Sequence, residues 1–149
     1  DSAADLASHF PPQIIDPEIH KLLEEGPSRR RRFLDWGVFH VEPSFMPTWQ
    51  RYHRALRQRN AGFRQGVAEA LATVWDAELA SAGEALSELR ARYVQLLSPG
   101  LSAIGQRLLG LEVGLAYHRG WPADEPLLQS LARGQERDQR YGVTHAGPH

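Results

Sequence analysis

Two runs of mostly apolar side chains, spaced alternately by four and three residues, limit the fold of this chain more than any other feature. The first run consists of Phe45, Trp49, Tyr52, Leu56, Arg59 and Phe63. The second consists of Trp75, Leu79, Ala82, Leu86, Leu89, Tyr93 and Leu96. This spacing places each run along one face of a helix, as in a coiled coil. About a dozen residues, including Gly62 and Gly66, separate the runs. The sequence therefore predicts an antiparallel helical hairpin whose second arm, residues 75–97, is roughly 34 Å long at ~1.5 Å per residue.

Turn and capping signals predict shorter elements before the hairpin. Residues 9–16 (HFPPQIID) suit a short strand or an edge connection, because the two prolines oppose a helix. Asp16 can cap a helix that begins at Pro17, where the missing N–H costs nothing. That helix is expected to end near Glu25, ahead of Gly26-Pro27.

A second helix is predicted between Ser28 and Glu42-Pro43. We expect it to direct Phe33, Leu34 and either Trp36 or Gly37 toward a core. Its four consecutive arginines, residues 29–32, are compatible with a phosphate-binding tract and with an ordinary solvated helix face.

The region after the hairpin combines helix and strand signals. Ser98-Pro99-Gly100 predicts a kink, after which an apolar stripe resumes at Leu101, Ile104, Leu108 and Leu111. Residues 111–118 and 141–149 resemble strands and flank a helix over 127–140, in which Gly134 is a weak point. Because these strands are too few to form their own sheet, we expect them to pair with a neighbouring part of a larger protein. The predicted fold class is mainly α, with α+β character at the ends: an antiparallel helical hairpin, or short coiled-coil arm, with a few flanking strands.

Composition excludes several classes of protein. The 42% apolar and 23% charged residues are typical of a globular chain and not of a disordered one. Cysteine is absent, which excludes disulfides, a thiol nucleophile and thiolate metal sites. No apolar run approaches the ~20 residues of a membrane span, so we expect a cytoplasmic protein. The lone methionine is Met46 and residue 1 is aspartate, from which we expect the numbering to begin inside a longer product.

The charge of the chain is asymmetric although its formal net charge is only −1. Residues 28–64 contain nine arginines against Asp35 and Glu42, which gives +7, so the remaining residues sum to −8. A segment with this excess of positive charge indicates an anionic partner. The arginines of the first hairpin arm have two possible roles. They either form a row that binds successive phosphates, or they lie on a solvated helix face where their aliphatic chains cover the apolar seam. Trp36, Trp49, Trp75 and Trp121 fit core packing better than base stacking.

Short motifs do not assemble a catalytic or metal site. Residues 131–135 (LARGQ) superficially resemble the signature of ABC ATPases but have alanine where that signature has serine. His145 and His149 have the spacing of zinc ligands on a helix, but Gly147-Pro148 forbids that helix. The sequence also lacks a phosphate-binding Gly-x-x-x-x-Gly-Lys-Ser/Thr loop and a Gly-x-Ser-x-Gly nucleophile elbow.

Three segments resemble motifs of RecF, a family of bacterial replication and recombinational-repair proteins. The first contains Pro17, Glu18, Leu22, Leu23 and residues 26–35, with Arg30 and Arg31 on the paired arginines of the family and Phe33-Leu34-Asp35 after them. The second is Gln58-Arg59-Asn60, and the third runs from Thr144 to Gly147-Pro148-His149. The three motifs keep the order and spacing of the family over most of the chain, although Ile19-His20 and Glu25 depart from its pattern.

The resemblance implies the architecture of SMC-like and Rad50-like ABC-type ATPases, in which a head dimerises around ATP and carries a short helical arm. On this basis residues 1–26 adjoin the head, 27–110 form the arm, and 111–149 return to the head. The ATP-binding loop is expected before Asp1, and the signature and metal-binding acidic motif after His149. The resemblance thus implies ATP and Mg²⁺ in the full-length protein, but no catalytic residue, metal or cofactor within these residues.

The resemblance also implies a function and partners. RecF-like proteins bind double-stranded DNA and single-strand/double-strand junctions as ATP-dependent homodimers. With RecO and RecR they support the loading of RecA onto gaps coated by single-strand binding protein. From the residues alone, a helical protein–protein interaction module without a nucleic-acid role remains the alternative.

The candidate site residues fall into two sets. Those expected to contact DNA are Arg29, Arg32, Arg51, Arg54, Arg57 and Arg64. Those in family motifs, expected to be structural or interfacial, are Pro17, Glu18, Arg30, Arg31, Phe33, Leu34, Asp35, Gln58, Arg59, Asn60, Gly147, Pro148 and His149.

Overall fold

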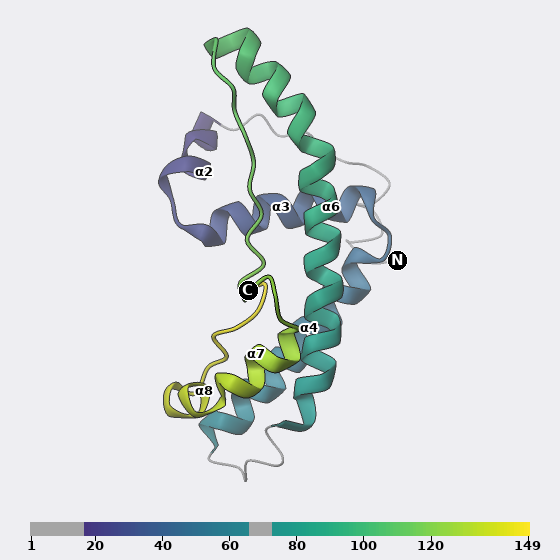
Figure 1. The fold of residues 1–149 in the computed structure, drawn as a ribbon, viewed down its shortest axis with the longest axis vertical. Helices are drawn as coiled ribbons and strands as arrows, with labels where there is room; N and C mark the ends of the chain where they lie inside the picture. The colour runs from purple at the N-terminus through teal and green to yellow at the C-terminus, as the bar shows by residue number, and fades with distance from the viewer. Residues whose placement is uncertain (1–16, 66–72) are drawn as a thin grey trace. The chain divides into compact units, whose positions relative to one another are not determined.

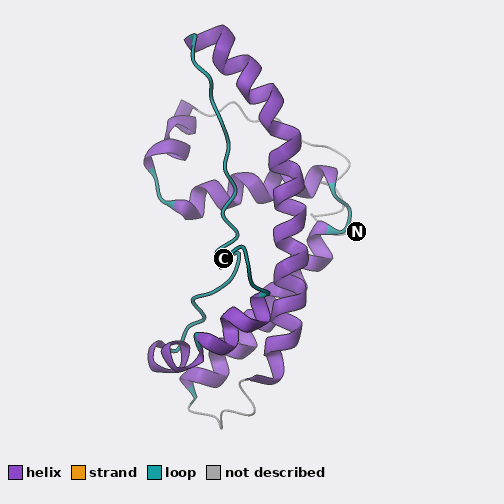
Figure 2. Ribbon diagram, viewed as in Figure 1, coloured by secondary structure: helices purple, strands orange, loops and turns teal. Residues whose placement is uncertain are grey.

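A computed structural model describes residues 17–65 and 73–149, which form helices joined by turns and loops (Figures 1 and 2). The elements are η1 (Pro17–His20), α2 (Lys21–Glu24), α3 (Pro27–Val41), α4 (Phe45–Arg64), η2 (Thr73–Trp75), α6 (Asp76–Leu109), α7 (Leu127–Arg133) and α8 (Gln135–Tyr141). The mainly helical fold predicted from the sequence is confirmed. The chain divides into two compact units, residues 1–43 and 44–149. The predicted strand at 9–16 and the predicted cap at Asp16 lie outside the described residues.

The first unit contains η1, α2 and α3. Pro27 occupies the start of α3, and the helix ends at Val41, as its flanking residues predict. Its buried residues are Gly37 and Val38, whereas Phe33 and Trp36 are 43% and 46% exposed. The expectation that Phe33 faces a core is therefore wrong, and of Trp36 and Gly37 it is Gly37 that is buried. At 3.6 residues per turn, the five apolar residues among 33–38 spread over more than half of the helix circumference, so a single packing face cannot cover them all.

The second unit is built on the predicted hairpin. α4 and α6 pack against each other and run in opposite directions (Figure 1). The residues that α4 buries are Phe45, Tyr52, Ala55, Arg59 and Phe63. Those that α6 buries are Asp76, Leu79, Ala80, Ala82, Gly83, Leu86, Ser87, Leu89, Arg90 and Gly105. The hairpin prediction is confirmed, but the buried seam ends earlier on α6 than the repeat does, because α4 has 20 residues and α6 has 34. Leu96 is consequently 72% exposed.

α6 continues through the proline at which the sequence predicts a kink. Pro99 lies inside the helix, which ends only at Gly110, whose positive φ of 65° suits a residue without a Cβ. A proline removes one N–H donor from the helix interior and bends the axis. In Figure 1 the last turns of α6 lean away from the direction of its first turns.

The region after α6 differs from its prediction. Residues 111–118 form a loop, and of residues 141–149 the first closes α8 while the others are turn and loop, so the described chain has no strand at either place (Figure 2). A strand needs a neighbour for its backbone N–H and C=O groups, and no described segment supplies one. The single helix predicted over 127–140 is split into α7 and α8 at Gly134, the weak point in its pattern.

A buried arginine joins the elements of the second unit. Arg59 on α4 is fully buried. Its guanidinium donates to Asp76 Oδ1 at the start of α6 and to Asp138 Oδ2 on α8, both at 2.6 Å. It also donates to Thr144 Oγ1 at 2.9 Å and lies 4.6 Å from the centre of the Phe63 ring. One side chain thus connects both arms of the hairpin with α8 and the segment that follows it.

The hairpin also depends on a close approach at Gly83. A Cβ added there would lie 2.6 Å from Leu127 Cδ2 and 3.1 Å from the ring of Tyr52. Leu127 and Tyr52 are both fully buried, so neither side chain has space to move aside. The absence of a side chain at Gly83 therefore allows α4, α6 and α7 to meet.

We expect Gly83→Ala to lower the free energy of unfolding by about 1–3 kcal/mol, because the added methyl overpacks a filled core. Gly100→Ala is the matched control on the same helix, since nothing lies within 4 Å of a Cβ at that position. That control should raise stability by about 0.5–1 kcal/mol through helix propensity. Urea denaturation followed by circular dichroism measures both changes, and equal effects of the two substitutions would contradict the close approach at Gly83.

We expect Arg59→Met to lower the free energy of unfolding by about 3–5 kcal/mol, because it leaves two buried carboxylates without their cation. Arg57→Met, on the exposed side of the same helix, should change stability by no more than about 0.5 kcal/mol. The same denaturation experiment measures both. A loss below about 1 kcal/mol for Arg59→Met would show that the buried ion pairs do not hold the unit together.

Candidate functional site

Two of the sequence motifs meet in the second unit although 84 residues separate them. Asn60, next to Arg59, accepts hydrogen bonds at its Oδ1 from the backbone N and the hydroxyl of Thr144, at 2.8 and 2.7 Å. The Thr144 hydroxyl in turn accepts from Arg59. Asp138 accepts from the backbone N of His145 at 3.1 Å and contacts His145 Nδ1 at 2.7 Å. The motif at 58–60 therefore fixes the start of the motif at 144–149.

The end of the second motif is held by the middle of the hairpin. His149 Nε2 lies 2.9 Å from the Thr144 carbonyl, which can only accept, so Nε2 carries the proton. Nδ1 then accepts from the Tyr52 hydroxyl at 2.6 Å. Arg90 on α6 donates to the carbonyl of Pro148. Gly147 has φ +144°, and a Cβ there would lie 2.5 Å from Tyr52 Oη, so both conformation and space require glycine.

The outer side of α4 carries the basic residues of the second unit. Arg51, Arg54, Arg57 and Arg64 are all exposed. Spacings of three and seven residues bring these side chains onto one side of a helix. Arg54 and Arg57 make no hydrogen bond or ion pair with the part of the chain that the structure describes. Their guanidinium groups are therefore available to an external anion.

Arg51 differs from its neighbours because it is paired. Its Nε and Nη2 donate to the two carboxylate oxygens of Glu78 on α6, at 2.9 and 3.0 Å. These hydrogen bonds raise the pKa of Arg51 and lower the pKa of Glu78 from their ordinary values. Both side chains are about half exposed, so water and salt screen the attraction and the pair adds little to stability. Its main effect is to occupy Arg51 with an internal anion.

The arginines of α3, in the first unit, have different surroundings. Arg30 donates to the carbonyls of Glu25 at 2.9 Å and Leu22 at 3.4 Å, which caps the C-terminal end of α2. Arg29 pairs with Glu25 at 3.1 Å. Arg31 is half-buried, and Arg32 is exposed.

The other motif residues of this unit form no common cluster. Glu18 is exposed and pairs with Lys21, while Leu34 and Asp35 are half-buried. Pro17 begins η1. Gln58, in the second unit, is exposed.

A groove of about 560 Å³ lies beside the basic side of α4. Its lining residues are Pro47, Trp49, Gln50, Arg51, His53, Arg54, Arg57, Trp75 and Glu78. Trp49 contacts His53, one turn away, with ring centres 4.0 Å apart. Trp49 and Trp75 are half-buried, whereas Trp121 is only 8% exposed. Core packing, which the sequence favours for the tryptophans, thus describes Trp121 but not these two.

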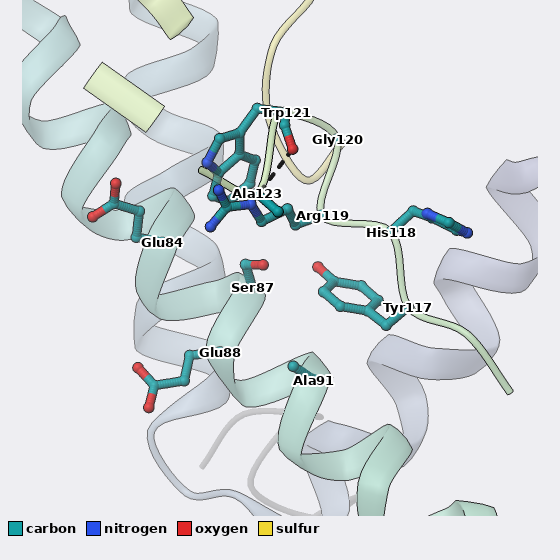
Figure 3. Close-up of a pocket in the computed structure, with 10 residues that line it drawn as sticks. All are labelled: Glu84, Ser87, Glu88, Ala91, Tyr117, His118, Arg119, Gly120, Trp121 and Ala123. Carbon is teal, nitrogen blue, oxygen red and sulfur yellow. Dashed lines mark hydrogen bonds between the residues drawn. The ribbon is translucent and has the colours of Figure 1, made fainter. Parts of the chain in front are cut away.

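A larger pocket, of about 810 Å³, lies on the other side of the second unit's long helix and has an acidic rim (Figure 3). Glu84, Ser87 and Glu88 on α6 line it together with residues 117–121, and in Figure 3 Ser87 points toward Arg119 whereas the carboxylate of Glu88 points away from residues 117–119. The Trp121 Nε1 and Tyr117 Oη atoms are buried and have no partner in the described chain. The lining of this pocket also includes the cation Arg119, and Glu88 is paired with Arg92.

Two further classes of site are not indicated. Among residues 17–65 and 73–149, no group of histidine, aspartate and glutamate side chains is arranged to hold a metal ion. Nor does any helix in the same ranges combine the length and the apolar character that a membrane span requires.

Sequence reasoning missed several residues of the buried network. Asp76, Arg90 and Asp138 are buried and charged, and none of them belongs to a predicted motif. The one signal for the two aspartates was Arg59 itself, because an arginine in an apolar seam requires a buried acceptor. Its partners lie 17 and 79 residues away, so no local pattern could identify them.

Comparison with known proteins gives a consistent result. No protein-family model matches the chain. It is 48% identical over 149 residues to the DNA replication and repair protein RecF of Pseudomonas fluorescens strain Pf0-1, covering 99% of this chain and 41% of the relative. It is 47% identical to RecF of Pseudomonas aeruginosa strain LESB58, covering 40% of that relative. The chain thus spans about two-fifths of the length of the curated relatives it matches.

Solved structures agree on the fold. A structure described as the recombination mediator protein RecF-ATPrS in the RecFOR pathway matches with a TM-score of 0.92 over 99% of this chain and 43% of that one, at 24% identity. A RecF-ATP structure matches with a TM-score of 0.84. The sequence identity of 47–48% over 99% of the chain, together with this shared fold, shows that the chain matches a part of RecF, a DNA replication and repair protein.

Proposed function

We propose that this chain is the helical arm of a RecF-like DNA repair protein and that the outer side of α4 contacts the DNA backbone. The observation that carries the proposal is the pair Arg54 and Arg57, which are exposed on one side of a helix without an internal partner. Guanidinium groups bind phosphate oxygens in two-point geometry and release counterions as they do so. Arg64 extends the same side of α4, and Arg32, exposed on α3, is proposed as a separate phosphate contact.

A stiff arm suits this role. The 34-residue α6 is locked to α4 by the Arg59 network and by the close approach at Gly83. We infer that the arm moves as a body when ATP and Mg²⁺ bring together two heads, which lie in parts of the protein other than these residues. In this proposal the chain is not itself an enzyme; the full-length protein binds and hydrolyses ATP, forms a homodimer on gapped DNA, and supports RecA loading with RecO and RecR in the cytoplasm.

The alternative is a helical protein–protein interaction module without a nucleic-acid role. Exposed apolar side chains on the last part of α6 favour it, among them Leu96, Ile104 and Leu108. The two proposals differ in salt dependence, because phosphate contacts give a steep logarithmic dependence of affinity on salt concentration and apolar contacts do not.

We expect replacement of Arg54 and Arg57 by glutamine in the intact protein to weaken binding to duplex DNA. Each lost phosphate contact should make the slope of log affinity against log salt concentration shallower by about 0.9. The slope of the double variant should therefore be shallower by about 1.8. Fluorescence anisotropy at four or more salt concentrations measures the slope. Arg92→Gln, on α6 and paired with Glu88, is the control; an unchanged slope in the double variant would remove the DNA role of α4.

We expect Glu78→Gln to strengthen duplex binding, because it releases Arg51 from its internal partner and removes a negative charge. One additional phosphate contact should steepen the salt slope by about 0.9. Glu88→Gln removes the same charge from α6 outside the groove, and it should leave the slope unaltered. If both substitutions strengthen binding equally, net charge and not Arg51 is responsible.

A further inference from the structure

The groove beside α4 combines aromatic surface with cationic side chains. Trp49 and Trp75 are half-buried and line it from α4 and η2 respectively. The imidazole of His53 contacts one side of the Trp49 ring system at 4.0 Å between centres. The indole of Trp49 is thus in contact with a second ring, and both rings line the groove.

The charges of the groove are distributed unequally. Arg54 and Arg57 line it and have no partner in the described chain. Glu78, the acidic group among the lining residues, is already bound by Arg51 through two hydrogen bonds. The uncompensated charge in the groove is therefore positive, and it lies next to aromatic surface.

We propose that this groove binds one unpaired nucleotide of a DNA strand, with its base stacked on Trp49 and Trp75 and its phosphate held by Arg54 and Arg57. The inference rests on the proposed function, because it uses the same side of α4, but it names a different chemistry. A base inside a duplex has both faces covered by its neighbours, whereas an unpaired base can stack on an aromatic side chain, which contributes about 1–3 kcal/mol.

The dimensions and composition of the groove favour a nucleotide over other occupants. Its volume of about 560 Å³ lies within the ~300–1,000 Å³ typical of small-ligand pockets. An acidic peptide could satisfy the two arginines but would leave the indoles uncovered. An apolar peptide could cover the indoles but would bury the two cations without an anion, which is unfavourable.

The test separates the contribution of the base to binding from the contribution of the phosphate. Binding of the intact protein to two labelled 12-nucleotide strands is compared, one of thymidines and one with the same phosphates and abasic sites throughout. We expect the thymidine strand to bind about 5- to 150-fold more tightly, which is 1–3 kcal/mol at 1.4 kcal/mol per tenfold change. Trp49→Leu should abolish most of this difference while leaving the affinity for the abasic strand unchanged.

Two controls keep the result interpretable. Trp49→Phe retains a ring and should retain most of the preference for the thymidine strand, and thermal unfolding shows whether each variant is folded. Trp36→Leu removes a tryptophan that is 46% exposed on α3 and should change neither affinity.

Each outcome has a distinct meaning. If Trp49→Leu lowers affinity for both strands equally, or for neither, the stacking site is refuted. If it has no effect while the Arg54 and Arg57 variant still flattens the duplex salt slope, α4 contacts backbone only and the proposed function survives. If neither variant alters nucleic-acid binding but Trp49→Leu weakens binding of a partner protein, the groove is a peptide site and both proposals fall.

Discussion

The ion pairs of Arg59 are the interaction on which the second unit depends. A charged guanidinium without contact to water is costly unless every donor finds an acceptor, and here two carboxylates, a hydroxyl and an aromatic ring surround it. Because those acceptors come from α6, α8 and the segment after α8, the network can be satisfied only when all of these elements are in place. An apolar residue at this position could pack against α6 without specifying where α8 lies.

The same network explains why two distant motifs depend on each other. Arg59 and Asn60 are hydrogen-bonded to Thr144. Tyr52 is hydrogen-bonded to His149, and Arg90 to the carbonyl of Pro148. The segment 144–149 contains no helix or strand of its own, so side chains of the hairpin fix its path.

The surface of the second unit is divided by charge. The outer side of α4 is basic, and the pocket beside residues 117–123 has carboxylates at its rim. The Arg51–Glu78 pair lies at the edge of the basic side and offsets part of its charge. Glu78 is thus the acidic residue of α6 that lies on the basic side, whereas Glu84 and Glu88 line the other pocket.

The sequence by itself determined the hairpin, the end of α3 before Glu42-Pro43, the presence of Arg59 in the seam and the resemblance to RecF. Those features depend on local periodicity, capping and order along the chain, which one sequence contains. Tertiary structure decided the partners of Arg59, the exposure of Phe33 and Trp36, the loop at 111–118 and the half-buried tryptophans of the groove. Burial and pairing are properties of segments brought together from distant positions: whether Trp49 joins a core or a groove depends on what packs across from it, and the spacing of residues along α4 contains no information about that.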